Sequence, residues 1–154
     1  MDENLETQSA DKKPDLLKRL KTQRETYTSE IIAGIQLLRD IRTLTEAKVT
    51  FLSLRQRILE DNHTLIESFN RVSRNYREKK SSVLIDISSN MQVRLNEREK
   101  EKYLDGLPDI SKLKSAIDTL DSQSKFLQES MKTVDQVLFG LKVRIDTEKI
   151  LLGI

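Results

Sequence analysis

The feature that most constrains this chain is a long stretch without a strong helix breaker. Between Asp15 and Asp105 there is no Pro and a single Gly, Gly34. Proline removes a backbone donor and clashes with the preceding helical turn, and glycine weakens a helix interior relative to alanine. Because almost nothing interrupts a helix here, the sequence predicts one long coiled-coil helix over residues 15–104, beginning after Pro14.

The composition is typical of long, well-solvated helices. Of the 154 residues, 36% are hydrophobic, 34% are charged and only 5% are aromatic, and there is no Trp. This is little apolar material for a globular core, and many charges together with few Gly and Pro residues favour coiled coil. We therefore expect an all-α protein, an elongated coiled coil with a C-terminal helical hairpin.

Apolar residues of the expected helix recur at heptad spacing. A main series steps by seven from Leu17, and further apolar residues beside it widen the stripe, which predicts more than one neighbouring helix. Two Ser pairs and a β-branched cluster near residues 80–90 lower helix propensity, so a bend and a continuous helix are equally expected there. The main series is Leu17, Arg24, Ile31, Leu38, Thr45, Leu52, Leu59, Ile66 and Ser73, and the flanking residues include Leu44, Phe51, Leu54, Ile58 and Leu65.

A turn is predicted at residues 105–109, where the sequence reads Asp-Gly-Leu-Pro-Asp. Its Gly suits helix termination, its Pro cannot continue the preceding helix, and an Asp or Ser is available to cap the next one. The cleanest heptad of the chain follows, so residues 109–152 are predicted to form a second coiled-coil helix with a hydrophobic tail. This helix is expected to fold back on the upstream helix or to join another chain.

The tail of this second helix carries more apolar residues than a single coiled-coil seam needs. Either it enters a larger bundle or it docks in a groove on another subunit, and we favour docking. The residues expected to bind a partner are Leu127, Met131, Val134, Val137, Leu138, Phe139, Leu141 and Ile145.

One local basic patch stands out from a charge balance that is nearly even, with 27 Lys and Arg against 25 Asp and Glu. A basic helical face can bind phosphates or an acidic partner, although such a run of charges is more often an exposed face of a coiled coil. The candidate nucleic-acid-binding residues are Arg71, Arg74, Arg77, Lys79 and Lys80.

Nothing in the sequence indicates catalysis, a cofactor, a metal ion or a small-molecule substrate. There is no Cys and one His, His63, which cannot build a Cys-His site alone. No phosphate-binding glycine loop or serine-nucleophile motif is present. The absence of Cys suits an intracellular protein, which we expect. We also expect residues 1–14 to be a disordered acidic N-terminus, and we find no signal core or membrane span in the sequence.

The segment TVDQVLFGL at residues 133–141 resembles the C-terminal segment of the centromere protein H family. The order of an acidic start, a long coil and a short hydrophobic tail is also similar. The resemblance implies a non-catalytic coiled-coil scaffold of the inner kinetochore, located at the centromere in the nucleus. It further implies a second coiled-coil subunit and a helical-repeat subunit as partners, with residues Val134, Val137, Leu138, Phe139 and Leu141 at a subunit junction.

Two classes of function are therefore expected. The first is a structural subunit of a multi-protein helical complex, whose apolar seams are completed by other chains in a hetero-oligomer. The alternative is a helical protein that binds nucleic acid or a membrane surface through the basic patch, or a subunit of a trafficking or transcription complex.

Overall fold

The computed structural model describes residues 16–90 and 95–153, and this part of the chain is helical without strands, which confirms the all-α class. The α-helices are α1 (Leu16–Leu37), α2 (Leu44–Asn90), α3 (Glu97–Asp105) and α4 (Pro108–Leu152), with a short 3-10 helix at Ile41–Thr43. The disordered N-terminus expected at residues 1–14 lies outside the described residues.

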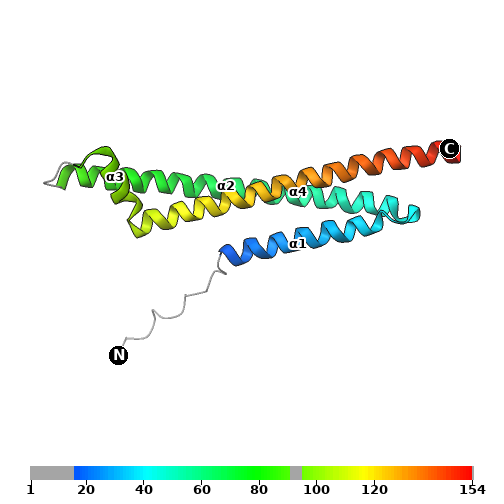
Figure 1. Cartoon of the computed structure of the whole chain (residues 1–154), viewed down its shortest axis with the longest axis horizontal. Helices are drawn as coiled ribbons and strands as arrows, with labels where there is room; N and C mark the ends of the chain where they lie inside the picture. Colours follow the sequence, from blue (N-terminus) through cyan, green and yellow to red (C-terminus); the bar gives the residue numbers. More distant parts are fainter. Residues whose placement is uncertain (1–15, 91–94, 154) are drawn as a thin grey trace, which may run out of the picture.

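The two long helices α2 and α4 run antiparallel and pair along much of their lengths (Figure 1). Helix α1 folds back beside them and covers the half of the pair nearer the C-terminal end of α4. The short helix α3 lies at the opposite end, where the chain passes from α2 to α4. The molecule is therefore a rod that has three helices in one half and two long helices in the other.

The prediction of a single helix over residues 15–104 is wrong, because the chain reverses between α1 and α2. The carboxylate of Asp40 accepts a hydrogen bond from the backbone N–H of Arg42 at 2.9 Å. The hydroxyl of Thr43 donates to the carbonyl of Leu37 at 2.6 Å. These side chains satisfy backbone groups that a helix end leaves without a partner, so the reversal needs neither Gly nor Pro.

The two other boundaries follow local sequence signals more closely. Helix α2 continues through residues 80–90, where a bend was one of two expectations, and residues 91–94 lie outside the description. Helix α3 begins with a capping box in which Asn96 and Glu99 exchange two hydrogen bonds of 2.9 Å.

The turn predicted at residues 105–109 is confirmed, with Pro108 in the first turn of α4. The cap expected from Asp or Ser is not formed, because Leu107 occupies the cap position without a side-chain hydrogen bond. Gly106 has a φ of −77°, so the turn does not use the positive φ that glycine allows.

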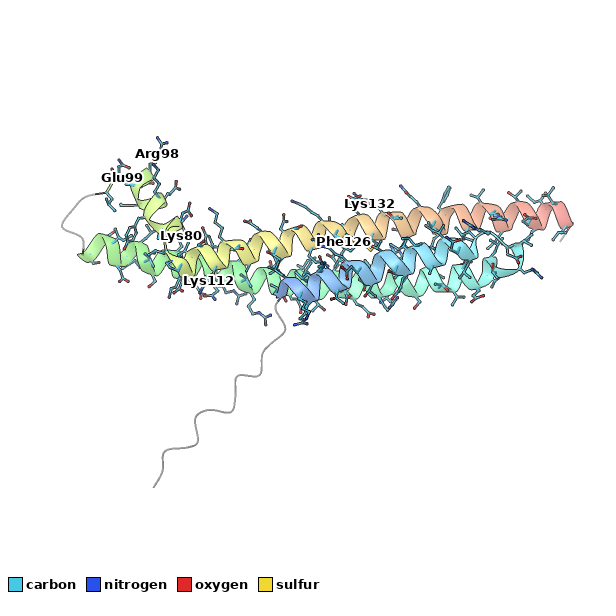
Figure 2. All side chains as sticks on the ribbon, turned by 60° about the horizontal axis from the view of Figure 1, so that its bottom comes forward. Lys80, Arg98, Glu99, Lys112, Phe126 and Lys132 are labelled. Atoms are coloured by element: carbon cyan, nitrogen blue, oxygen red, sulfur yellow. The ribbon has the colours of Figure 1, made fainter. Side chains whose placement is uncertain are left out.

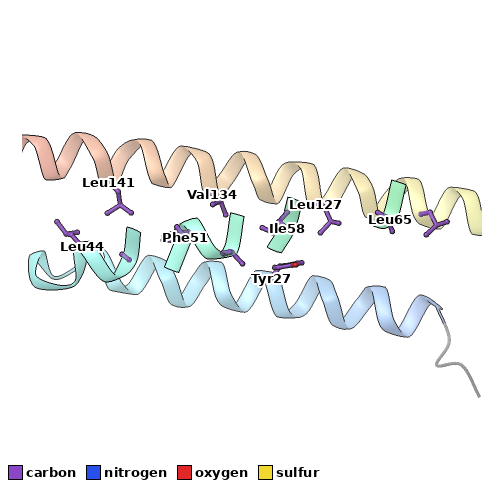
Figure 3. Close-up of a cluster of buried hydrophobic side chains, with 11 residues drawn as sticks. Tyr27, Leu44, Phe51, Ile58, Leu65, Leu127, Val134 and Leu141 are labelled. Atoms are coloured by element: carbon purple, nitrogen blue, oxygen red, sulfur yellow. The ribbon is translucent and has the colours of Figure 1, made fainter. Parts of the chain in front are cut away.

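The core runs between α2 and α4 and is closed on one side by α1 (Figure 3). The buried residues of α2 are the flanking positions of the sequence pattern, not its main series. Phe51 and Ile58 are 0% exposed, whereas Leu52 and Leu59, one residue later, are 49% and 41% exposed. The seam was therefore assigned to the wrong face of this helix. The core cluster comprises Tyr27, Leu44, Ala47, Phe51, Leu54, Ile58, Leu65, Leu120, Leu127, Val134 and Leu141.

Candidate interaction surfaces

A layer of polar side chains crosses the bundle and holds α1 against α2 and α4. Gln123 of α4 is 0% exposed and lies at its centre. Its amide donates to Gln23 at 2.7 Å, and its carbonyl accepts from Arg24 at 2.5 Å. The carboxylate of Asp61 on α2 accepts from Gln23 at 2.6 Å and from the hydroxyl of Tyr27 at 2.5 Å. These five residues, the polar layer, join all three helices.

The electrostatics of this layer suit a structural role. Burial raises the pKa of Tyr27 well above its usual range, and the hydrogen bond to Asp61 adds to the rise. Arg57 forms an ion pair with Glu30, which raises the arginine pKa. Every buried side-chain nitrogen and oxygen of the described residues has a hydrogen-bond partner. The buried polar atoms of the layer are therefore paired within the bundle.

The end of α4 carries a group of exposed apolar side chains, which we call the α4 tail. Helix α4 extends past the turn between α1 and α2 (Figure 1), so its last turn has no other helix of the described residues beside it. The exposed fractions are 70% for Phe139, 49% for Val143, 79% for Ile150, 75% for Leu151 and 66% for Leu152. Exposed apolar side chains gathered in this way are typical of a protein interaction site.

The eight residues predicted to bind a partner are divided between the core and the surface. Leu127, Val134 and Leu141 are buried in the core, and Met131, Val137, Leu138 and Ile145 are partly buried against it. Their apolar contacts in this fold are therefore made with the chain's own helices. Phe139 has the largest exposed fraction of the eight, 70%. A contact of these residues with another chain stays a prediction, strongest at Phe139.

A second exposed apolar group lies on α2 and was not predicted as a site. Leu52, Leu59 and Ile66 are spaced by seven and are 49%, 41% and 42% exposed. We call them the α2 stripe. The sequence signal was present, because these residues belong to the main heptad series, but the series was taken for the buried seam. Their exposure identifies them as surface that a further helix can cover.

The basic patch is spread over different parts of the surface. Arg71 lines a hollow between α1 and α2, while Arg74 and Arg77 line a separate hollow with Asn70. Lys79 forms an ion pair with Asp109 of α4 at 3.5 Å. Figure 2 shows Lys80 at the end of the rod near α3, with Arg98 and Glu99 directed away from α2 and α4. The fold therefore does not gather the five residues into one cationic face.

Within residues 16–90 and 95–153, no group of three His, Cys, Asp or Glu side chains is arranged to hold a metal ion. His63 is exposed and lies 3.6 Å from Glu67, one helical turn away. None of the helices in this part of the chain combines the length and the apolar character needed to cross a membrane.

The fold and surfaces define an elongated all-α protein with exposed apolar helix faces. Comparisons with models of known protein families, with curated proteins and with solved structures find no match to this chain. Any assignment of function therefore depends on the chain's own residues and geometry.

Proposed function

We propose that this protein is a non-catalytic structural subunit of a multi-protein helical complex, and that the α4 tail docks against another helical subunit. The observation that carries this proposal is the exposure of the tail. Phe139, Val143 and Ile150 follow a spacing of four and then seven residues, which places them on one face of α4. Such a face fits a groove between helices of another protein.

The gain from covering the tail is large enough to support a stable contact. Full burial of a Val, Leu, Ile or Phe side chain contributes about 1.5–3 kcal/mol. The five tail residues expose between 49% and 79% of their surface. Covering them therefore supplies on the order of 5–10 kcal/mol before the costs of association are subtracted.

The resemblance of residues 133–141 to the centromere protein H family supports a particular setting for this subunit. It favours the inner kinetochore at the centromere, and hence the nucleus, with a coiled-coil subunit and a helical-repeat subunit as partners. Within that segment Phe139 is the large apolar residue that is exposed, whereas Val134 and Leu141 stabilise the chain's own core. In this setting Phe139 makes the contact between subunits.

The test compares a tail variant with a matched control in cells of the source organism. Ile150→Asp combined with Leu151→Asp changes the tail, and Val49→Asp combined with Ile85→Asp places the same two charges at 63% exposed positions of α2. We expect tagged wild type and the control to concentrate at centromeres and to copurify with the same subunits. The tail variant should lose both properties while keeping the helical circular dichroism of the wild type.

The outcomes separate the general proposal from the specific one. If subunits copurify only when the tail is intact but the protein is not found at centromeres, the scaffold role stands and the kinetochore setting is rejected. Identical copurification by wild type and tail variant would reject docking through the tail.

A further inference from the structure

The seam between α2 and α4 has two edges, and α1 covers only one of them. On the covered edge, Arg24 of α1 donates to Gln123 and lies over the ring of Phe126, 5.4 Å from its centroid. The opposite edge is closed by contacts between α2 and α4 alone. There Ser124 donates to Asn62 at 3.2 Å, and Arg55 pairs with Asp135 at 2.6 Å. We call this second edge the open edge.

The open edge carries two rows of apolar side chains beside its polar pairs. Its α2 side carries the α2 stripe of Leu52, Leu59 and Ile66. On its α4 side, Met131 and Leu138 follow Ser124 at intervals of seven and are partly buried against the core. Two parallel rows of apolar side chains at heptad spacing form the kind of surface that a packed helix covers.

The charge at one end of the open edge is positive and uncompensated. Moving one heptad from the ion pair of Arg55 and Asp135 brings Lys48 on α2 opposite Lys142 on α4. Neither lysine forms an ion pair with any residue the structure describes. The Arg55 and Asp135 pair, one heptad away, has opposite charges, whereas Lys48 and Lys142 present two ammonium groups. Acidic residues of a partner would stabilise these two positive charges.

The other lysines of α4 near this edge are already compensated. Lys125 pairs with Asp121 at 2.7 Å and Lys132 with Glu129 at 2.6 Å. Figure 2 shows Lys132 on the side of α4 away from α1, and Phe126 on the side facing it. The unmatched charge of the open edge is therefore concentrated at Lys48 and Lys142.

We propose that the open edge binds one amphipathic helix of another protein, with apolar residues at heptad spacing and acidic residues facing Lys48 and Lys142. This site is separate from the α4 tail and does not depend on the function proposed above. Docking would convert the three-helix half of the rod into a four-helix bundle, with the new helix diagonal to α1. A second copy of this chain is a poorer fit, because its own open edge presents the same unmatched lysines.

The experiment uses two designed peptides that form the same amphipathic helix, with Leu at the heptad core positions. One carries Glu at the flanking positions and the other carries Lys. Binding of each labelled peptide to the full chain is measured by fluorescence anisotropy. We expect the Glu peptide to bind, the Lys peptide to bind at least about tenfold more weakly, and added salt to reduce the difference.

Three variants locate the binding site. Leu59→Ser should weaken binding of the Glu peptide by about tenfold or more, whereas Ile85→Ser, the same kind of change elsewhere on α2, should leave it unchanged. Lys48→Glu combined with Lys142→Glu should reverse the preference between the peptides. Thermal melting followed by circular dichroism checks that each variant is folded. The tail variant used above should bind the Glu peptide as the wild type does.

Three results would overturn the proposal. They are equal binding of both peptides, no binding of the Glu peptide, and binding that Leu59→Ser does not weaken. Light scattering on the unlabelled protein supplies a fourth. A dimer that Leu59→Ser converts to a monomer would assign the open edge to a second copy of the chain.

Discussion

Two glycines inside helices provide a matched test of how closely α1 packs on α2. A Cβ atom added at Gly34 would lie 2.8 Å from Cζ of Phe51, while one added at Gly140 would have nothing within 4 Å. Neither glycine has a positive φ. Replacing Gly by Ala in a helix interior stabilises the folded protein by about 1 kcal/mol through helix propensity, and this gain applies at either site. Overpacking a buried ring costs about 1–3 kcal/mol, and this cost applies only to Gly34→Ala.

The difference between the two variants isolates the packing cost, because the gain in helix propensity cancels. Gly140→Ala should raise the free energy of unfolding by about 1 kcal/mol. The free energy of unfolding of the Gly34→Ala variant should be about 1–3 kcal/mol lower than that of the Gly140→Ala variant. Urea denaturation followed by circular dichroism measures both values. Equal stabilisation by the two substitutions would refute the close approach of α1 to α2.

A double-mutant cycle assigns the cost to the ring. In a Phe51→Leu background the ring is removed, so Gly34→Ala should lose most of its penalty. A penalty that persists in this background would show that Gly34 is constrained by something other than Phe51.

The remaining predictions concern the core, the polar layer and the turn. Leu127→Ala should lower the free energy of unfolding by about 2–5 kcal/mol in urea denaturation, because it leaves a cavity in the core, whereas Phe139→Ala should change it by less than about 0.5 kcal/mol. The raised pKa of Tyr27 stabilises the fold below pH about 10, and this contribution is lost as pH rises further, so Tyr27→Phe should flatten the alkaline fall of the melting temperature. The hydrogen bonds from Arg42 lower the pKa of Asp40. The destabilisation of Asp40→Asn should therefore be seen in thermal melts above pH about 4 and should disappear as pH falls below the lowered pKa.

The parts of the fold that the sequence predicted well are those specified by local chemistry. The helix expected over 109–152 is observed as Pro108–Leu152. Gly106 and Pro108 mark the boundary because a proline is tolerated in the first turn of a helix and not in its interior. The all-α class followed from the same scarcity of Gly and Pro in the rest of the chain.

The reversal between α1 and α2 escaped prediction because its cause is tertiary. Asp40 and Thr43 are tolerated inside helices at a small cost in propensity, and nothing in their spacing demands a turn. Their hydrogen bonds compensate for a reversal that is stabilised by packing of Tyr27 and Gly34 against the other helices. Interrupting the helix at these positions costs at most about 1 kcal/mol of helix propensity. The burial of apolar side chains of α1 contributes more than this, so the reversal is favoured.

The candidate sites show what heptads leave undetermined. A heptad identifies which side chains need burial, but it does not say whether the covering helix belongs to the same chain. Leu127 and Val134 were expected to contact another chain and are buried by α2. The α2 stripe was expected to be a seam and is exposed. Shifting the seam by one residue on α2 exchanges buried positions for exposed ones, which explains the exposure of the α2 stripe, while a contact of the α4 residues with another chain stays a prediction.

Apolar side chains alone would not fix the position of α1 along the groove, because residues repeated every seven positions tolerate a slip of one heptad. The polar layer removes this freedom. Both hydrogen bonds of buried Gln123 are made by adjacent residues of α1, Gln23 and Arg24. A slip of one heptad would place either Leu16 and Leu17, or Glu30 and Ile31, at these positions. The first pair leaves the amide with no partner, and the second leaves its carbonyl without a donor. Each unsatisfied group costs about 1–3 kcal/mol, so the polar layer selects one register for α1 along the α2–α4 seam.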